Sequence, residues 1–135
     1  MNAMRISIDN TILSFDDELS FDVFIKNMED WDCTSCKSVF DNIYVFYNDA
    51  YGYGLSANKI KEKYNEVASI IAGSAIYTTA IVFKSYEPNT PYYETDYGLV
   101  PLSEEDIAKI KLLISSKINN IDWSKIEDNE NKKSQ

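Results

Sequence analysis

Apolar and polar residues alternate at the start of the chain, which is the pattern of a half-buried β-strand. In MRISIDNTILSF (residues 4–15), every second residue from Met4 to Ile8 is apolar, and the apolar positions resume after Asp9-Asn10. Asp and Asn are typical turn residues, so the pattern predicts an opening strand or a β-hairpin.

The next two segments have different periodicities. Apolar residues of segment 21–31 recur at spacings of three and four, which predicts a helix that Ser20 can cap. Residues 37–47, KSVFDNIYVFY, are instead rich in β-branched and aromatic types on both sides of Asp41-Asn42. This segment predicts one strand or a tight hairpin.

The second half of the chain predicts two further helices and a central strand. Apolar residues form one stripe over a helix at 57–72, and Gly73 follows where a left-handed cap commonly ends a helix. Residues 75–86 are nearly continuous β-formers, typical of a strand covered on both faces. Ser103 and Asp106 form a capping-box-like start for the last helix. Its inward-facing side chains are expected to be Ile107, Ile110, Ile114, Ile118 and Ile121.

These elements define the expected fold class. Their order is roughly β(β)–α–β(β)–α–β–α, which favours an α+β protein with a mostly antiparallel sheet of four to five strands and about three helices packed on it. We expect a single domain over residues 1–124 and a polar, frayed C-terminal tail over residues 125–135.

The charge balance is the strongest signal in the composition. The chain of 135 residues has 13 basic and 22 acidic side chains, a formal charge of −9 and no histidine. Such a surface repels phosphate, which disfavours direct binding of nucleic acid or an anionic membrane, and it attracts basic partners. No apolar run approaches the roughly 20 residues that span a bilayer, and MNAMRISIDN lacks the apolar block of a secretory signal. We expect a cytoplasmic protein.

Groups that could carry catalysis are few. Cys33-Thr-Ser-Cys36 has the spacing of a thioredoxin-type redox motif, but the segment before it predicts a helix rather than the strand that such a site requires. Two cysteines without histidine do not make a zinc site, and the chain has no GxSxG elbow and no complete glycine-rich phosphate loop. We therefore expect no enzyme activity, no metal and no cofactor, and keep a small thiol oxidoreductase using Cys33 and Cys36 as an alternative.

Tyrosines and carboxylates are concentrated in two segments predicted to be loops. One is YNDAYGYG (47–54), and the other lies within residues 85–106, which hold four tyrosines, six carboxylates and all three prolines without a lysine or arginine. Strand alternation assigns Tyr44 or Tyr47, and Tyr77, to the core. Exposed loop tyrosines instead present stiff contact surfaces, and carboxylates beside them would recognise lysine and arginine on a partner. A loop packed on its own sheet is the alternative. The residues expected to bind a partner are Asp49, Tyr51, Tyr53, Glu87, Tyr92, Tyr93, Glu94, Asp96 and Tyr97.

In composition and organisation the chain resembles the immunity proteins of bacterial toxin systems, including contact-dependent growth inhibition. The residues that carry the resemblance are the acidic-aromatic stretches 47–54 and 86–98 (YEPNTPYYETDYG), together with DDELSFD (16–22). The resemblance implies a one-to-one complex with a cognate basic toxin, often a nuclease, whose active site is covered. A second alternative is a phage-type inhibitor whose acidic face mimics nucleic acid. Self-association remains open.

Overall fold

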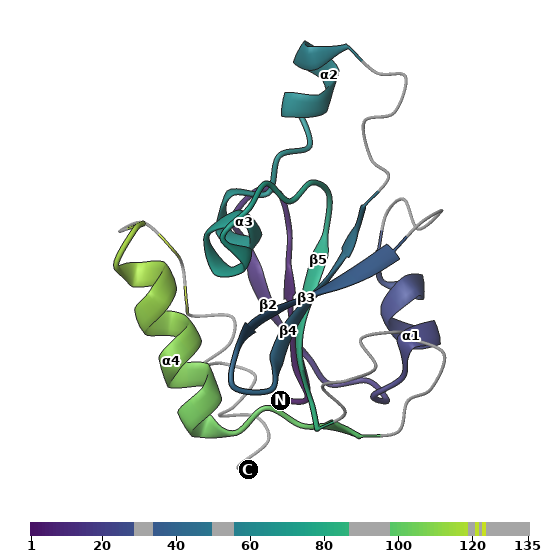
Figure 1. Ribbon diagram of the computed structural model, residues 1–135, viewed down its shortest axis with the longest axis vertical. Helices are drawn as coiled ribbons and strands as arrows, with labels where there is room; N and C mark the ends of the chain where they lie inside the picture. The colour runs from purple at the N-terminus through teal and green to yellow at the C-terminus, as the bar shows by residue number, and fades with distance from the viewer. Residues whose placement is uncertain (29–33, 50–55, 87–97, 119–120, 122, 124–135) are drawn as a thin grey trace.

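An antiparallel six-stranded sheet forms the centre of the molecule (Figure 1). The computed structural model describes residues 1–28, 34–49, 56–86, 98–118, 121 and 123. In chain order the elements are β1 (Ala3–Ile6), β2 (Ile12–Phe15), α1 (Phe21–Lys26), β3 (Thr34–Phe40), β4 (Ile43–Asn48), α2 (Ala57–Lys61), α3 (Glu66–Ala72), β5 (Ala80–Ser85), β6 (Leu99–Val100) and α4 (Glu104–Ser115). The α+β class is confirmed, with β6 and the short α2 added to the expected elements.

The two segments that predicted a strand or a hairpin both form hairpins. β1 and β2 pair antiparallel from Ala3↔Phe15 to Ile6↔Ile12, and Asn10 in their turn has a left-handed φ of 66°. β3 and β4 pair around Asp41, whose φ is 39°. Asn and Asp tolerate this left-handed region better than most residues, which is why these positions form the turns.

β5 is the central strand, as its continuous β-forming sequence predicts. The strand order is β2-β1-β5-β4-β3, and β6 pairs with the last residues of β5. In Figure 1, α3 and α4 lie on one side of the sheet and α1 lies on the other. The core below α3 and α4 is aliphatic; its largest fully buried members are Met4, Ile6, Ile12, Ile43, Ile76, Ile110 and Ile114. The core below α1 is aromatic and contains Phe15, Phe21, Phe24, Tyr44, Phe46 and Phe83.

The prediction of one helix over residues 57–72 is wrong. The segment divides into α2 and α3, and Asn65 between them caps α3 by accepting a hydrogen bond from the Ala68 amide (3.1 Å). Tyr64 leaves the helical path and forms a β-bridge with Tyr77. Tyr77 was expected in the core but is only half-buried, whereas Tyr44 is buried as expected. Gly73 ends α3 with a left-handed φ of 73°, as predicted.

The first helix is shorter than its periodicity predicts. α1 ends at Lys26 with Asn27 as its C-cap, and Trp31 lies outside the described residues. Ser20 occupies the N-cap position, but its side chain makes no capping hydrogen bond. Because α1 has six residues, packing of its two buried phenylalanines rather than intrinsic propensity holds it on the sheet.

α4 begins with the expected capping box. The Ser103 hydroxyl accepts from the Asp106 amide (3.1 Å), and the Asp106 carboxylate accepts from the Ser103 amide (2.9 Å). The same carboxylate pairs with Lys84 of β5 at 2.9 Å, which ties the helix start to the central strand. Of the five isoleucines expected inward, four are buried and Ile121 is half-buried.

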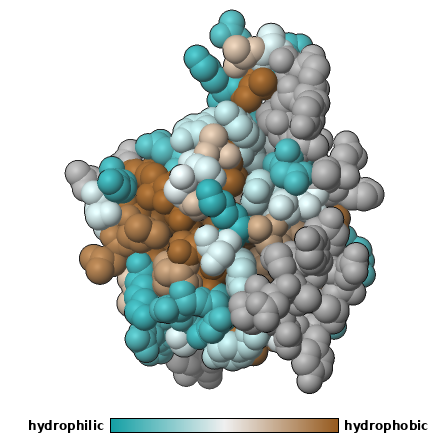
Figure 2. Space-filling model, viewed as in Figure 1, coloured by the Kyte–Doolittle hydropathy of each residue, from teal (hydrophilic) through white to brown (hydrophobic). Residues whose placement is uncertain are grey.

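Apolar surface gathers over the C-terminal half of α4 and beside α3 (Figure 2). Leu112 of α4 is 73% exposed there. None of the described helices combines the length and apolar composition that a bilayer span requires. The tail expected to fray, residues 125–135, lies outside the described residues.

Acid is expected to weaken the start of α4 through Asp106. Burial alone raises the pKa of this carboxyl group, but hydrogen bonds from Ser103 and the ion pair with Lys84 outweigh burial and lower the pKa below its ordinary 3.8. A depressed folded-state pKa contributes stability above 3.8, and this contribution is lost as the pH falls through the folded value. Asp106→Asn should therefore lower the free energy of unfolding by about 1 kcal/mol at neutral pH, and the deficit should shrink in acid.

Urea unfolding of both proteins across the acid range measures this difference. Glu104→Gln is the matched control, because Glu104 lies in the same first turn and is exposed. An Asp106→Asn deficit that stayed constant down to pH values well below 3.8 would contradict the assignment.

Candidate functional site

Strand direction brings several acidic parts of the chain to one end of the sheet. The antiparallel pairings place the end of β2, the β3–β4 turn and the end of β5 together, and the Lys84–Asp106 ion pair adds the start of α4. This is the lower end of the sheet in Figure 1. We call its exposed carboxylates and the exposed tyrosine beside them the acidic end; they are Asp16, Asp17, Glu18, Asp41, Tyr86, Glu104 and Glu105.

Hydrogen bonds and ion pairs fix the segments of the acidic end relative to one another. The Asn2 side-chain amide donates to the Asp17 carbonyl oxygen (2.9 Å), and the Asn2 carbonyl oxygen accepts from the Leu102 amide (3.1 Å) just before α4. Lys109 of α4 reaches Asp41 at 3.3 Å and Glu105 at 3.4 Å. The carboxylates are therefore carried by a rigid framework, although they come from parts of the chain far apart in sequence.

The cations described at this end are already paired. The N-terminal ammonium group lies 3.9 Å from Asp16, and Lys84 and Lys109 form the ion pairs given above. The hydrogen bond to Asp41 raises the pKa of Lys109, so this lysine remains charged at neutral pH. Asp17, Glu18 and Glu104 have no ion pair among the described residues. The acidic end thus presents uncompensated negative charge to solvent.

Tyr86 is the described aromatic residue of the acidic end. It is 56% exposed, and the Lys84 ammonium lies 5.4 Å from its ring centroid in a cation–π contact. The Tyr86 amide donates to the Gly98 carbonyl oxygen (2.9 Å), which closes the base of the intervening segment. The predicted site residues within that segment lie outside the described residues; they are Glu87, Tyr92, Tyr93, Glu94, Asp96 and Tyr97.

The second predicted segment starts at the opposite end of the sheet. Asp49 is exposed and directly follows β4, while Tyr51 and Tyr53 lie outside the described residues. Because β4 and β5 are antiparallel and Ile43 pairs with Lys84, Asp49 and Tyr86 are about eight residue positions apart along the strands, or roughly 26 Å. The structure therefore does not bring Asp49 to the acidic end.

The predicted list of binding residues contains none of the seven residues of the acidic end. Asp16, Asp17 and Glu18 belong to the stretch 16–22 that carries the family resemblance, and Asp41 belongs to the segment expected to form a strand or hairpin. Glu104 and Glu105 lie within the capping-box-like start expected for the last helix. These residues have in common that each follows or precedes a strand at the same end of an antiparallel sheet. This can be recognised only when the strand order is known.

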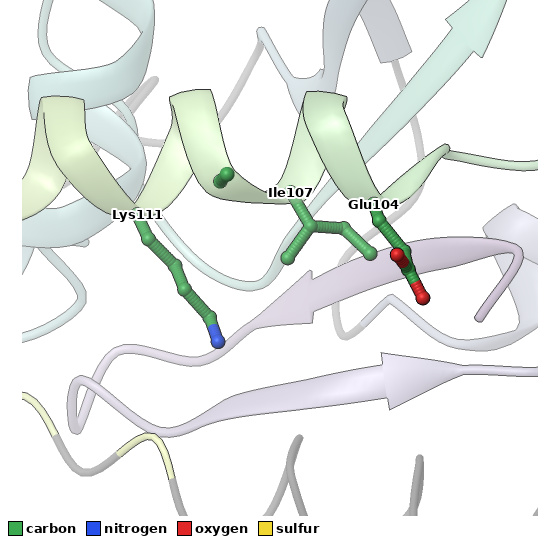
Figure 3. A pocket seen from close by; sticks show the side chains of 4 residues that line it. Glu104, Ile107 and Lys111 are labelled. Carbon is green, nitrogen blue, oxygen red and sulfur yellow. The ribbon is translucent and has the colours of Figure 1, made fainter. Parts of the chain in front are cut away.

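A shallow pocket adjoins the acidic end along α4. It has a volume of about 210 Å³ and is lined by Glu104, Ile107, Ala108 and Lys111. Figure 3 shows the labelled side chains projecting from α4 toward the N-terminal strands, drawn in pale purple. The described residues contain no group of three or more His, Cys, Asp or Glu side chains able to hold a metal ion.

The environment of Cys36 does not activate its thiol. It lies within β3, packed against the aromatic core, and burial raises the pKa of its thiol to about 12. Thioredoxin-type sites need a thiol near a helix start whose pKa is lowered. Cys33, the other cysteine of the motif, lies outside the described residues.

Cys36 is expected to resist alkylation. In a Cys33→Ser variant, iodoacetamide at pH 8 should modify the remaining thiol far more slowly than a free cysteine, because the nucleophilic thiolate is scarce well below a pKa of about 12. Mass spectrometry follows the reaction, and the same variant in guanidinium chloride gives the unprotected rate. Equal rates in both conditions would contradict the burial of Cys36.

Comparison with known proteins identifies no relative: no family model, curated protein or solved structure matches the chain.

Proposed function

We propose that the protein is an immunity or antitoxin protein that binds a cognate basic toxin through the acidic end and covers its active site. The observation that carries the proposal is the exposed, uncompensated negative charge of Asp17, Glu18 and Glu104 beside an exposed tyrosine. The N-terminal ammonium group, Lys84 and Lys109 are already paired with other carboxylates, so among the described residues no ion pair occupies Asp17, Glu18 or Glu104 before a partner's lysines and arginines arrive.

The framework beneath the acidic end favours protein binding. Its carboxylate residues lie at strand ends and in the first turn of a capped helix, so the backbone that carries them loses little conformational freedom when a partner docks. Tyr86 supplies a stiff aromatic surface of the type that is enriched in binding hot spots. The pocket along α4 offers a recess for a partner side chain, lined by two apolar residues, Ile107 and Ala108, and by the charged Glu104 and Lys111.

A basic nuclease is the toxin class that fits this chemistry best. Its substrate groove must attract phosphate, so the same groove attracts a surface of carboxylates. Electrostatic attraction raises the association rate, and the aromatic and apolar contacts then slow dissociation. Inhibition follows from occupation of the groove and requires no chemistry by the inhibitor itself.

The proposal predicts that a toxic domain is encoded next to this chain, and co-expression with that domain tests it. The unmodified chain should restore growth, and the purified pair should form a one-to-one complex. Asp17→Lys/Glu18→Lys should weaken this complex at least about tenfold, because two attractive contacts become repulsive. Asp49→Lys/Glu66→Lys is the matched control, since it changes the net charge equally on exposed residues away from the acidic end.

Two outcomes would count against the proposal. Failure to protect against, or to bind, the neighbouring toxin would remove the proposed function. Equal inhibition of unrelated nucleases, such as a pancreatic ribonuclease, would instead support the nucleic-acid mimic.

A further inference from the structure

α2 and the two residues after it form an exposed basic projection at the opposite pole of the molecule. We call residues 57–63 the basic arm; they contain Lys59, Lys61 and Lys63 against a single acidic residue, Glu62. α2 has no buried residue, and Figure 1 shows it at the upper extreme of the longest axis, apart from the sheet. Lys59 and Lys61 are exposed and form no ion pair with any described residue.

Such a helix is poorly supported by its own chain. α2 has five residues, whereas isolated helices shorter than about 12 residues are marginal in water. Among the described residues, its tertiary anchors lie beyond its C-terminal end, where the Lys63 carbonyl oxygen accepts from the Thr78 amide (2.7 Å) and Tyr64 bridges to Tyr77. A projecting helix of this kind gains most from packing on a second molecule.

The basic arm cannot reach the acidic end of its own molecule. Its anchor at Thr78 lies before the start of β5, and the acidic end lies beyond the end of the same strand, roughly 20 Å away. Opposite charges held this far apart within one molecule remain available to pair between molecules.

From this separation and charge complementarity we propose that the basic arm of one copy docks on the acidic end of a second copy. Lys59 and Lys61 face Asp17 and Glu18 of the second copy in this contact. Because the two surfaces differ and lie at opposite poles, the contact is heterologous and adds copies head to tail rather than closing a two-fold dimer. The contact covers the surface used for the toxin in the proposed function, so the two associations compete. The inference does not depend on the toxin, and neither does its first test.

Sedimentation equilibrium of the purified chain tests the contact. At about 0.01 M salt, where the Debye length is ~30 Å, the weight-average mass should rise with protein concentration above the monomer mass of 15.5 kDa. At about 0.15 M salt, where the Debye length is ~8 Å, the rise should shrink markedly. A mass that stays monomeric at low salt over the accessible concentrations would overturn the proposal.

Charge reversal locates the two surfaces. Lys59→Glu/Lys61→Glu and Asp17→Lys/Glu18→Lys should each weaken self-association at low salt about tenfold. An equimolar mixture of the two variants should associate again, because the altered arm of one complements the altered end of the other. Lack of rescue in the mixture would overturn the head-to-tail contact even if both variants were monomeric.

A control variant distinguishes the loss of the lysines in the basic arm from the change in net charge. Lys26→Glu/Lys117→Glu removes two exposed lysines from α1 and from the end of α4, so its net charge equals that of the arm variant. It should self-associate almost as the unmodified chain does. Loss of association equal to that of the arm variant would show that general repulsion, and not the arm, decides the result. Circular dichroism confirms that each variant is folded.

Discussion

Phe24→Ala is expected to lower the free energy of unfolding by about 4 kcal/mol, since it removes a fully buried ring and leaves a cavity. The Phe24 ring makes edge contacts with Phe15 (5.4 Å between centroids) and Phe21 (5.6 Å), and tilted contacts with Phe46 and Phe83. These rings lie on three strands and on α1 itself, so they cannot collapse into the cavity together.

Equilibrium unfolding in urea measures the loss, with Leu112→Ala as the control. Leu112 is apolar and helical but 73% exposed, so its truncation should change the free energy of unfolding by less than about 0.5 kcal/mol. Phe24→Ala should also raise hydrogen exchange across α1, because this helix depends on its two buried phenylalanines. A loss below about 1 kcal/mol would mean that the aromatic core repacks.

The same substitution connects the fold with the proposed function. Asp16, Asp17 and Glu18 lie between β2 and α1, so their position depends on both elements. Phe24→Ala keeps every carboxylate of the acidic end. If it weakens toxin binding while the protein is still folded, the geometry of the acidic end matters in addition to its charge.

Local signals in the sequence predicted the parts of the fold that depend on near neighbours. The Ser103–Asp106 capping box spans three residues, and Gly73 ends α3 through its own backbone conformation. The turn at Asp9-Asn10 was likewise predicted from two residues and the alternation around them. In each case the interaction that determines the structure lies within one turn of chain.

Features that depend on distant partners escaped prediction. The apolar stripe over residues 57–72 is continuous, and the local indication of a break is a single residue, Asn65, of a type favoured at helix N-caps. The break arises because Asn65 finds partners on β1 and just before β5, which a sequence pattern does not reveal. The acidic end escaped for the same reason, since it is assembled from strand ends by the sheet order β2-β1-β5-β4-β3.

The antiparallel strand order also places the starts of the two tyrosine-rich, acidic segments far apart. Two tyrosine-rich, acidic segments suggested a single surface, yet they leave β4 and β5 at opposite ends. The proposed toxin contact is therefore assigned to the end that carries Tyr86 and Asp17. The other end carries the basic arm.

Asn65→Ala is expected to lower the free energy of unfolding by about 3 kcal/mol, because it leaves several buried polar groups without partners. The Asn65 side-chain amide donates to the carbonyl oxygens of Ile6 (3.0 Å) and Thr78 (2.8 Å), while its oxygen accepts from the Ala68 amide (3.1 Å). Asn65 is completely buried, so water cannot replace these bonds without opening the structure. Thr78 is also held with a left-handed φ of 62°, which is unfavourable for a β-branched residue.

The variant Asn65→Asp distinguishes the contribution of the two hydrogen bonds that Asn65 donates from the contribution of its helix cap. The introduced carboxylate still accepts from Ala68, but it faces two carbonyl oxygens to which it cannot donate when ionised. We expect this burial to raise its pKa above the ordinary carboxyl value, so the destabilisation should grow as the pH rises from about 4 to 7. The deficit of Asn65→Ala should instead be nearly independent of pH.

Urea unfolding of both variants at several pH values measures the contrast, and Asn58→Ala is the control on an exposed asparagine of α2. If both Asn65 variants lost less than about 1 kcal/mol, the amide would not be the link between α3, β1 and the start of β5. If the predicted loss is found, the basic arm should become disordered before the sheet unfolds. The arm is anchored through Thr78, and Asn65 is the side chain that holds Thr78 in place.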